Sequence, residues 1–146
     1  MGPAVELVEE AAGLVGDFAL NSALEQADIV VLPDGAIGPE DLAVGLDGTI
    51  YTTDHDGTLY RIDGDQPEIL DQLGGRPLGL TVGPDGALYI ADSFRGLMRW
   101  TAPGTLELLA DNRDGDPVIY ANQLTVARDG TIYFSNSSDR FDPETM

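Results

Sequence analysis

The chain has 146 residues, and 26 acidic residues against 7 basic ones give it a formal net charge of −19. The phosphates of nucleic acids and of anionic membranes would repel such a chain, so we expect neither as a partner. The absence of cysteine excludes a disulfide framework, a thiolate nucleophile and a cysteine-based zinc site.

Residues 1–27 are predicted to be a leader. Apolar residues recur at three- and four-residue intervals, which predicts a short amphipathic helix over residues 4–19. Because this helix lacks a basic face, packing or a loosely ordered leader is favoured over a membrane or partner helix. The sequence shows no secretory signal and no run of transmembrane length, so we expect no membrane segment and a soluble, cytoplasmic protein by default.

Residues 28–32 (DIVVL) are predicted to form a strand, closed by Pro33-Asp-Gly. A strand that precedes the first repeat has a natural use in a circular fold. It can supply the outer strand of the last sheet and so close the ring.

From residue 38 onward one pattern occurs three times. A short apolar run reaches an Asp-Gly pair, and a second apolar run with a tyrosine follows at once. The pairs start at Asp47, Asp85 and Asp129, so the intervals are 38 and 44 residues, which is typical of one four-stranded propeller blade per repeat. Asp-Gly between two apolar runs predicts a hairpin, since glycine accepts the positive φ of the turn. Recurrence of the same sequence favours a propeller over unrelated hairpins in a β-sandwich.

We therefore predict an all-β chain: a partial β-propeller of about two and a half four-stranded blades of a six-bladed ring, with a short N-terminal helix. The incomplete propeller is predicted over 28–146, with blade one at about 38–74, blade two at about 75–119 and half of blade three at 120–146. A six-bladed ring needs about 240 residues, so we expect the chain to be an N-terminal fragment. Its open edges should allow self-association.

The outer strands of the blades are predicted at 58–63, near 68–70, at 96–101 and at 105–109. Alternation of apolar and polar residues along them suits strands with one solvated face. The acidic segment 110–117 is predicted to be a loop, and it accounts for the longer second interval.

Two oxygen-bearing residues stand out at one repeat position. Seven residues before each Asp-Gly aspartate the chain has Glu40, Leu78 and Asn122. This position precedes the inner strand, where side chains of successive blades converge on the mouth of the central channel. A carboxylate and an amide oxygen suit a hard cation such as calcium. Capping or bracing of the strand entry by the same two residues is an equally good interpretation of the pattern.

Residues 37–44 (IGPEDLAV) and 120–141 (YANQLTVARDGTIYFSNSSDRF) resemble the strictosidine synthase-like family, which is grouped with the gluconolactonase, regucalcin and paraoxonase propellers. The resemblance runs from about residue 18 to the last residue. It implies a divalent-metal-dependent hydrolase of esters or lactones, with calcium as the usual ion. In those hydrolases a first-blade glutamate and a middle-blade asparagine bind the metal, and these roles would fall on Glu40 and Asn122. It assigns no catalytic residue, and the further ligands would come from later blades.

Two other functions stay open: a condensing or lyase enzyme like strictosidine synthase that uses no metal, and a non-catalytic propeller that acts as a binding module. In the plant condensing enzyme the position of Asn122 resembles a tyrosine, so Asn122 favours the hydrolase branch. The family often has Asn-Asp at 122–123 and Phe-Ser-Asp at 134–136, where this chain has Asn-Gln and Phe-Ser-Asn. The two missing carboxylates count against a second cation. Two donors cannot fill a calcium shell alone, so we expect no robust activity from the 146-residue chain.

Two residues that could carry chemistry receive structural interpretations. His55, the only histidine, falls in a predicted turn and is expected to be a solvated surface residue. Trp100 is expected to pack within a blade rather than to form a platform for a ligand. The sequence has no Gly-x-Ser-x-Gly elbow, phosphate loop or dinucleotide fingerprint.

Overall fold

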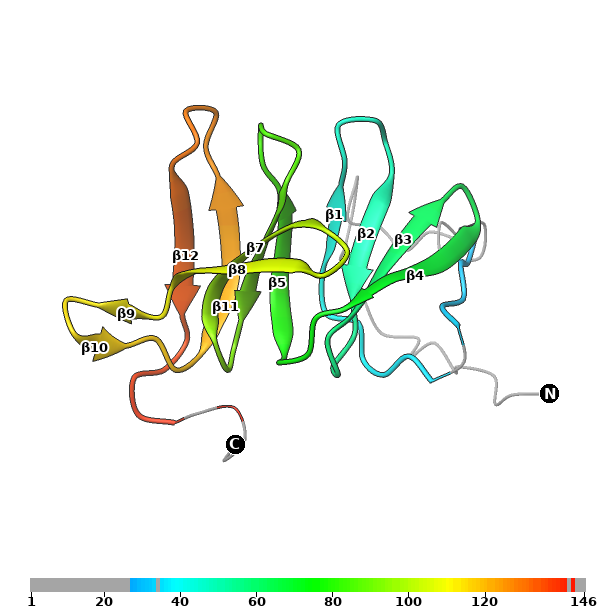
Figure 1. The fold of residues 1–146 in the computed structure, drawn as a ribbon. Helices are drawn as coiled ribbons and strands as arrows, with labels where there is room; N and C mark the ends of the chain where they lie inside the picture. Colours follow the sequence, from blue (N-terminus) through cyan, green and yellow to red (C-terminus); the bar gives the residue numbers. More distant parts are fainter. Residues whose placement is uncertain (1–26, 34, 142, 144–146) are drawn as a thin grey trace, which may run out of the picture.

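A computed structural model describes residues 27–33, 35–141 and 143. These residues form strands and no helix, which confirms the all-β prediction (Figure 1). The helix predicted over 4–19, and all but the last residue of the predicted leader, lie outside the described residues. Within the described part of the chain, no helix has the length and apolar character needed to cross a membrane.

The described strands form two four-stranded antiparallel sheets and two two-stranded ones, and in every sheet each strand pairs with its neighbour in the sequence. Sheet one consists of β1 (Leu42–Val44), β2 (Ile50–Thr53), β3 (Thr58–Asp63) and β4 (Gln66–Gln72). Sheet two consists of β5 (Pro77–Val82), β6 (Leu88–Asp92), β7 (Gly96–Ala102) and β8 (Thr105–Ala110). In the third sheet β11 (Ala121–Val126) pairs with β12 (Ile132–Asn136).

The first strands of the three sheets lie side by side. β5 packs against β1 on one side and against β11 on the other. In Figure 1 the three Asp-Gly turns lie together at the top, and β1, β5 and β11 all begin at the opposite end. Each repeat begins at the same end and turns at the other, so equivalent residues of the three repeats lie at the same level along the strand direction. The partial propeller predicted from the repeats is confirmed.

The Asp-Gly turns share one set of hydrogen bonds. In the first turn the Gly48 amide donates to the Gly45 carbonyl at 3.0 Å, and the Gly45 amide donates to the Thr49 carbonyl at 2.7 Å. The Asp47 carboxylate accepts from the Thr49 amide at 3.0 Å. Gly48 has a φ of 90°, so this is a tight turn followed by a glycine in the left-handed region, a common hairpin loop. The same bonds recur in the other two copies, at residues 83–87 and 127–131.

Two segments differ from their predictions. Residues 28–32 are not a strand: no backbone ladder pairs them with another described segment, and without a ladder an apolar run stays irregular. The predicted loop 110–117 contains a short hairpin, in which β9 (Asn112–Arg113) pairs with β10 (Asp116–Pro117). Asp114, with a φ of 53°, takes the left-handed conformation at its turn.

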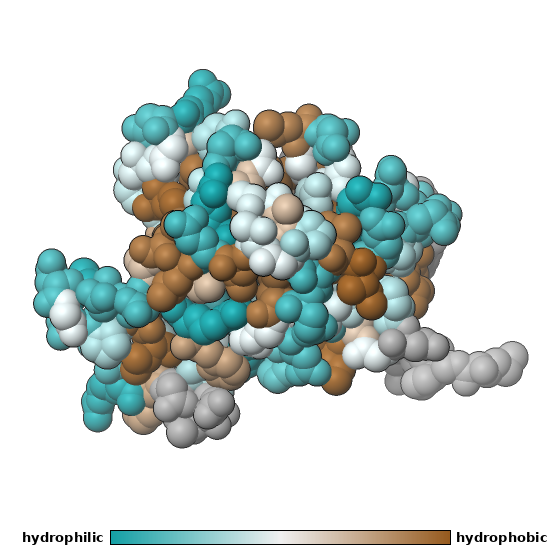
Figure 2. Space-filling model, in the orientation of Figure 1, coloured by the Kyte–Doolittle hydropathy of each residue, from teal (hydrophilic) through white to brown (hydrophobic). Residues whose placement is uncertain are grey.

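The main core lies between sheets one and two. Side chains of both sheets form one buried cluster, which includes Leu59, Leu88, Ile90 and Trp100. Trp100 is 8% exposed, so its predicted packing role is confirmed. A second cluster, built around Ala91, Leu97 and Leu124, joins sheets two and three. Figure 2 shows that apolar patches also reach the surface between polar residues.

Gly57 permits the close approach of two connections. Its carbonyl accepts a hydrogen bond from the Leu73 amide at 2.8 Å. It has a φ of 77°, and a Cβ added here would overlap the backbone of Gly74. Gly64 also has a positive φ, 62°, but open space surrounds its Cβ position.

We expect Gly57→Ala to destabilise the chain far more than Gly64→Ala. Both variants place alanine in a left-handed conformation, at a cost of roughly 1–2 kcal/mol. Only Gly57→Ala adds an overlap with backbone, which should raise the loss to more than about 3 kcal/mol. Urea unfolding followed by Trp100 fluorescence measures both values. Equal losses would contradict a packing role for Gly57.

We also expect self-association through the open side of β1, where Leu42 is 59% and Val44 58% exposed. The charge of −19 opposes association, so the oligomer fraction should rise with salt as the repulsion is screened. Sedimentation velocity at low and high sodium chloride measures this fraction. Val44→Glu should keep the chain monomeric at both salt concentrations. A salt-independent monomer in the unmodified chain would contradict the prediction.

Candidate metal site

The two predicted metal ligands lie at the same end of the first and third repeats. Glu40 stands two residues before β1 and is exposed, whereas Asn122 is the second residue of β11 and is half-buried. Between them, Leu78 is the second residue of β5. β5 lies between β1 and β11, so the three residues at this repeat position all lie at the same end of the three sheets.

The structure does not join the two candidates directly. Neither the Glu40 nor the Asn122 side chain makes a hydrogen bond or ion pair with another described residue. Glu40 borders a hollow of about 390 Å³ beside sheet one, together with Leu42 and Ile50. Within the described ranges, no three His, Cys, Asp or Glu side chains are grouped so that they could hold an ion.

Asp41, which follows Glu40, links the first two sheets. Its Oδ2 accepts a hydrogen bond from the Leu80 amide of β5 at 3.0 Å, and its Oδ1 accepts from the Leu42 amide at 2.8 Å. The Asp41 carbonyl accepts from the Thr52 hydroxyl at 2.7 Å. Both carboxylate oxygens and the main chain of this residue are thus engaged.

The backbone at Asn122 fits closely against β5. A Cβ added at Gly79 would lie 2.5 Å from the Asn122 carbonyl oxygen, so only glycine allows this approach. The pairing of β11 with β12 shifts register between Ala121 and Leu124, at the same place. The side chain of Gln123 is turned to local bonds, and its Oε1 accepts from the Leu124 amide at 3.0 Å.

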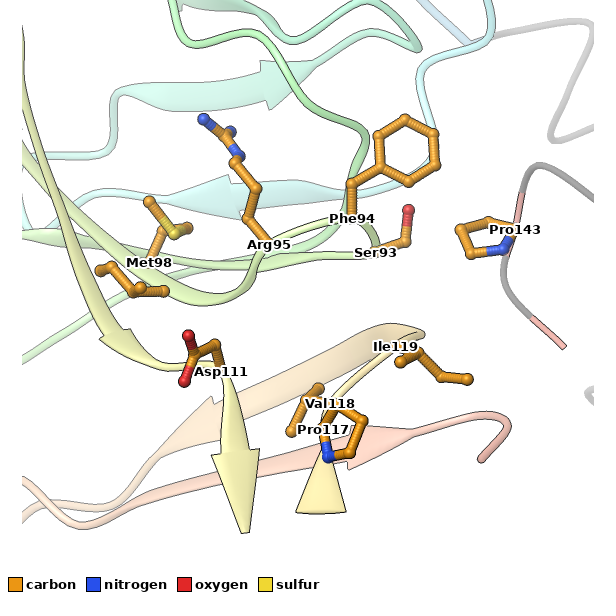
Figure 3. A pocket seen from close by; sticks show the side chains of 10 residues that line it. Ser93, Phe94, Arg95, Met98, Asp111, Pro117, Val118, Ile119 and Pro143 are labelled. Carbon is orange, nitrogen blue, oxygen red and sulfur yellow. The ribbon is translucent and has the colours of Figure 1, made fainter. Parts of the chain in front are cut away.

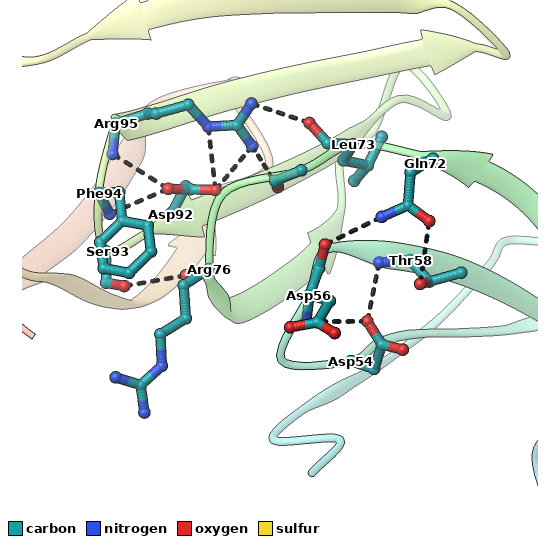
Figure 4. Close-up of polar contacts among 11 residues, drawn as sticks. Asp54, Asp56, Thr58, Gln72, Leu73, Arg76, Asp92, Ser93, Phe94 and Arg95 are labelled. Carbon is teal, nitrogen blue, oxygen red and sulfur yellow. Dashed lines mark hydrogen bonds and ion pairs between the residues drawn. The ribbon is translucent and has the colours of Figure 1, made fainter. Parts of the chain in front are cut away.

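Seven residues after each Asp-Gly aspartate stand Asp54, Asp92 and Asn136, whose side chains accept hydrogen bonds from nearby segments. Figure 4 shows the first two. Asp54 is 3% exposed and accepts from the Thr58 amide at 2.8 Å and from the Tyr60 hydroxyl at 2.9 Å. Burial, together with the bond to Asp54, raises the pKa of Tyr60. The Asn136 side chain accepts from the Tyr120 amide at 2.8 Å.

Asp92 and Arg95 form an ion pair that also braces the sheets, and Figure 4 shows the two side chains facing each other. Asp92 is fully buried, and its Oδ2 accepts from the Arg95 guanidinium at 2.7 Å and 3.1 Å. Arg95 also donates to the Leu73 carbonyl at 2.9 Å and to the Gly74 carbonyl at 2.8 Å. It therefore ties sheet two to the connection that leaves sheet one. A buried carboxylate needs such compensation, because an unpaired one is costly to desolvate.

Asp71 braces the same two sheets at their outer strands. Its Oδ2 accepts from the Trp100 indole and from the Gly104 amide, both at 2.8 Å, and its Oδ1 accepts from the Gln72 amide at 2.8 Å. These bonds, the indole bond first, hold the pKa of Asp71 below its ordinary value.

A hollow of about 800 Å³ lies between sheet two and the segment that connects it to β11, and its lining is mainly apolar (Figure 3). Phe94, Met98 and Val118 contribute to it. Arg95 also lines the hollow, but Asp92 and the two carbonyls use its donors. This hollow therefore presents a mainly apolar surface with one carboxylate, Asp111, that makes no ion pair with the described residues.

His55 is exposed, as predicted, and its amide donates to the Ile37 carbonyl at 2.7 Å. The equivalent residues Ser93 and Ser137 make the same bond to Arg76 and Tyr120. In each of the three repeats, this backbone hydrogen bond therefore holds the end of the second strand against the segment that enters the first strand.

Sequence reasoning assigned no role to four residues: Asp41, Asp54, Asp92 and Arg95. A signal existed for two of them, because Asp54 and Asp92 occupy the same position of consecutive repeats and are followed by a glycine three and four residues later, respectively. For Asp41 and Arg95 the signal was absent, since their partners are main-chain atoms of another repeat.

Repeated antiparallel sheets, with their first strands adjacent, define a chain of the β-propeller class. A family model described as "Strictosidine synthase-like, N-terminal" matches residues 16–62. The adipocyte plasma membrane-associated protein of Danio rerio is 31% identical, over 95% of this chain and 37% of its own length. Strictosidine synthase-like protein 4 of Arabidopsis thaliana is 36% identical, over 71% of this chain and 30% of its own length. The chain belongs to the strictosidine synthase-like family.

Solved structures show the same fold. A gluconolactonase from Xanthomonas campestris superposes with a TM-score of 0.67 and 25% identity, over 77% of this chain and 39% of its own. A streptogramin B lyase superposes with a TM-score of 0.61 and 23% identity, over 80% of this chain and 41% of its own. The chain thus spans about two fifths or less of the length of each of these proteins.

The Asp71 brace should make stability depend on pH. Because its folded-state pKa is depressed, its contribution is present above the unfolded value of 3.8 and is lost as pH falls through the lower folded value. We expect Asp71→Asn to cost about 1 kcal/mol at pH 7 and less at pH 3, measured by urea unfolding with circular dichroism. Asp63→Asn, at an exposed carboxylate, is the control and should cost little at either pH. A loss from Asp71→Asn that does not change with pH would contradict the brace.

Proposed function

We propose that this chain supplies part of a calcium site at the mouth of a propeller channel, in a protein that hydrolyses esters or lactones. One observation carries the proposal: Glu40 and Asn122 occupy the same repeat position, at the same end of β1 and β11, the two strands that flank β5. In a propeller the innermost strands of all blades surround one central channel, and the residues at their entries line the mouth of that channel. Oxygen donors from successive blades can then converge on one ion.

The chemistry of the donors fits calcium. Calcium accepts carboxylate and amide carbonyl oxygens and takes about six to eight of them. Among the described residues, the Glu40 and Asn122 side chains have no hydrogen-bond partner that would compete for their oxygens. The nearby carboxylate of Asp41 is already bound by two amides. We therefore assign two ligands to this chain and leave the others to waters or to further protein groups.

A bound calcium ion would polarise the carbonyl of an ester or lactone and stabilise the oxyanion that develops on it. The chain's own residues have two tasks. Glu40 and Asn122 hold the ion, and the mainly apolar hollow between sheet two and the segment leading to β11 offers a surface for the apolar part of a substrate. The gluconolactonase among the structural relatives supports a lactone as one substrate class.

The test is a calcium titration of the ¹⁵N-labelled chain followed by NMR, which resolves weak binding residue by residue. We expect the Glu40 backbone amide and the Asn122 side-chain amide to shift together and to saturate with one dissociation constant. Two protein ligands make a weak site, so this constant should lie at or above about 10⁻⁴ M. Glu40→Gln and Asn122→Ala should each abolish the shared transition.

Glu107→Gln, on the exposed outer strand β8, is the matched control and should leave the transition unchanged. Hydrolysis of an aryl ester and of a lactone is then measured with calcium and with EDTA, and we expect weak turnover that EDTA removes. The proposal fails if Glu40 and Asn122 do not respond to calcium. Turnover that survives EDTA would instead favour metal-free chemistry.

A further inference from the structure

We infer that Asp41 is a positioning residue that sets the spacing between Glu40 and Asn122, an inference that rests on the calcium site proposed above. Asp41 does not bind the ion in this assignment. It acts through the backbone, by tying the entry of β1 to β5, against which β11 packs.

The first step is the restraint on Glu40. Three hydrogen bonds hold Asp41, at its Oδ1, its Oδ2 and its carbonyl oxygen. Glu40 precedes it directly in an exposed segment and makes no side-chain bond of its own to the described residues. The peptide between them therefore transmits the position of Asp41 to Glu40, which otherwise has few local restraints.

The second step leads from Asp41 to Asn122. The bond from Asp41 ends on the amide of Leu80, and the preceding residue, Gly79, lies against the Asn122 carbonyl. Gly79 is buried and has no side chain, so β11 approaches β5 closely at this point. One continuous series of contacts thus joins Glu40 to Asn122 through β5. A metal site tolerates only small changes in the spacing of its ligands, so this series matters for affinity.

The chain contains a matched control for this role. Asp71 joins the same two sheets in the same manner, since its Oδ1 accepts from the next residue's amide and its Oδ2 accepts from sheet two. Its bonds lie at the outer strands β4 and β7, away from the entries of β1 and β11. Loss of either brace should loosen the contact between the sheets. Only loss of Asp41 should change the spacing of the proposed ligands.

The experiment compares Asp41→Asn with Asp71→Asn in the calcium titration. Asparagine keeps the shape of aspartate but turns an NH₂ group toward one of the two bound amides. We expect Asp41→Asn to weaken calcium binding about tenfold, as the loss of a group that orients a metal ligand typically does. Asp71→Asn should weaken it less than about twofold. Hydrogen exchange of the Leu80 amide, measured without calcium, should accelerate in Asp41→Asn and stay unchanged in Asp71→Asn.

If Asp41→Asn folds poorly, Thr52→Val gives a milder test, because it removes only the bond to the Asp41 carbonyl. Thr52→Val should also weaken calcium binding, by about twofold to threefold. Equal calcium affinity in Asp41→Asn and Asp71→Asn would overturn the positioning role and leave the calcium site in place. A wild-type chain whose Glu40 and Asn122 signals ignore calcium would overturn the site and the positioning role together.

Discussion

The structure depends on the close approach of β5 to its two neighbours. Among the described strands, β5 is the one first strand that packs against another first strand on both sides, and Gly79 allows β11 to reach it. On the other side the Asp41 carboxylate accepts from the Leu80 amide. Two adjacent residues of one strand therefore fix the distances to both neighbouring sheets. The spacing of β1, β5 and β11 at this end of the sheets depends on these two contacts.

The braces between sheets explain how so acidic a chain stays compact. Each of Asp41, Asp71 and Asp92 accepts hydrogen bonds from at least two donors, and each takes part in a contact between sheet one and sheet two. Amide, indole and guanidinium groups supply these donors, so negative charge is stabilised where the sheets meet. The bonds are directional, and they specify a single spacing that apolar packing alone would leave loose.

Much of the fold could be predicted because each repeat signals locally. The turns beginning near Asp47, Asp85 and Asp129 obey the chemistry of their own residues, and the strands flanking them follow from short-range alternation. Residues 28–32 show the limit of such reasoning, since a strand exists only through a partner and apolar composition does not supply one. The same limit hid Asp41 and Arg95, whose partners are main-chain atoms about 40 and 20 residues away, beyond the reach of a motif.

Counting acidic residues is a poor guide to metal ligands in this chain. A charge of −19 attracts cations in general, but the described residues contain no group of three metal-ligating side chains. The reason is that the repeats use their buried carboxylates, such as Asp54 and Asp92, to satisfy amides and hydroxyls of the sheets. Glu40 differs because its carboxylate is exposed and directly precedes a residue anchored to the next sheet. A carboxylate that is both unengaged and well placed is therefore a stronger indicator of a cation site than local acidity.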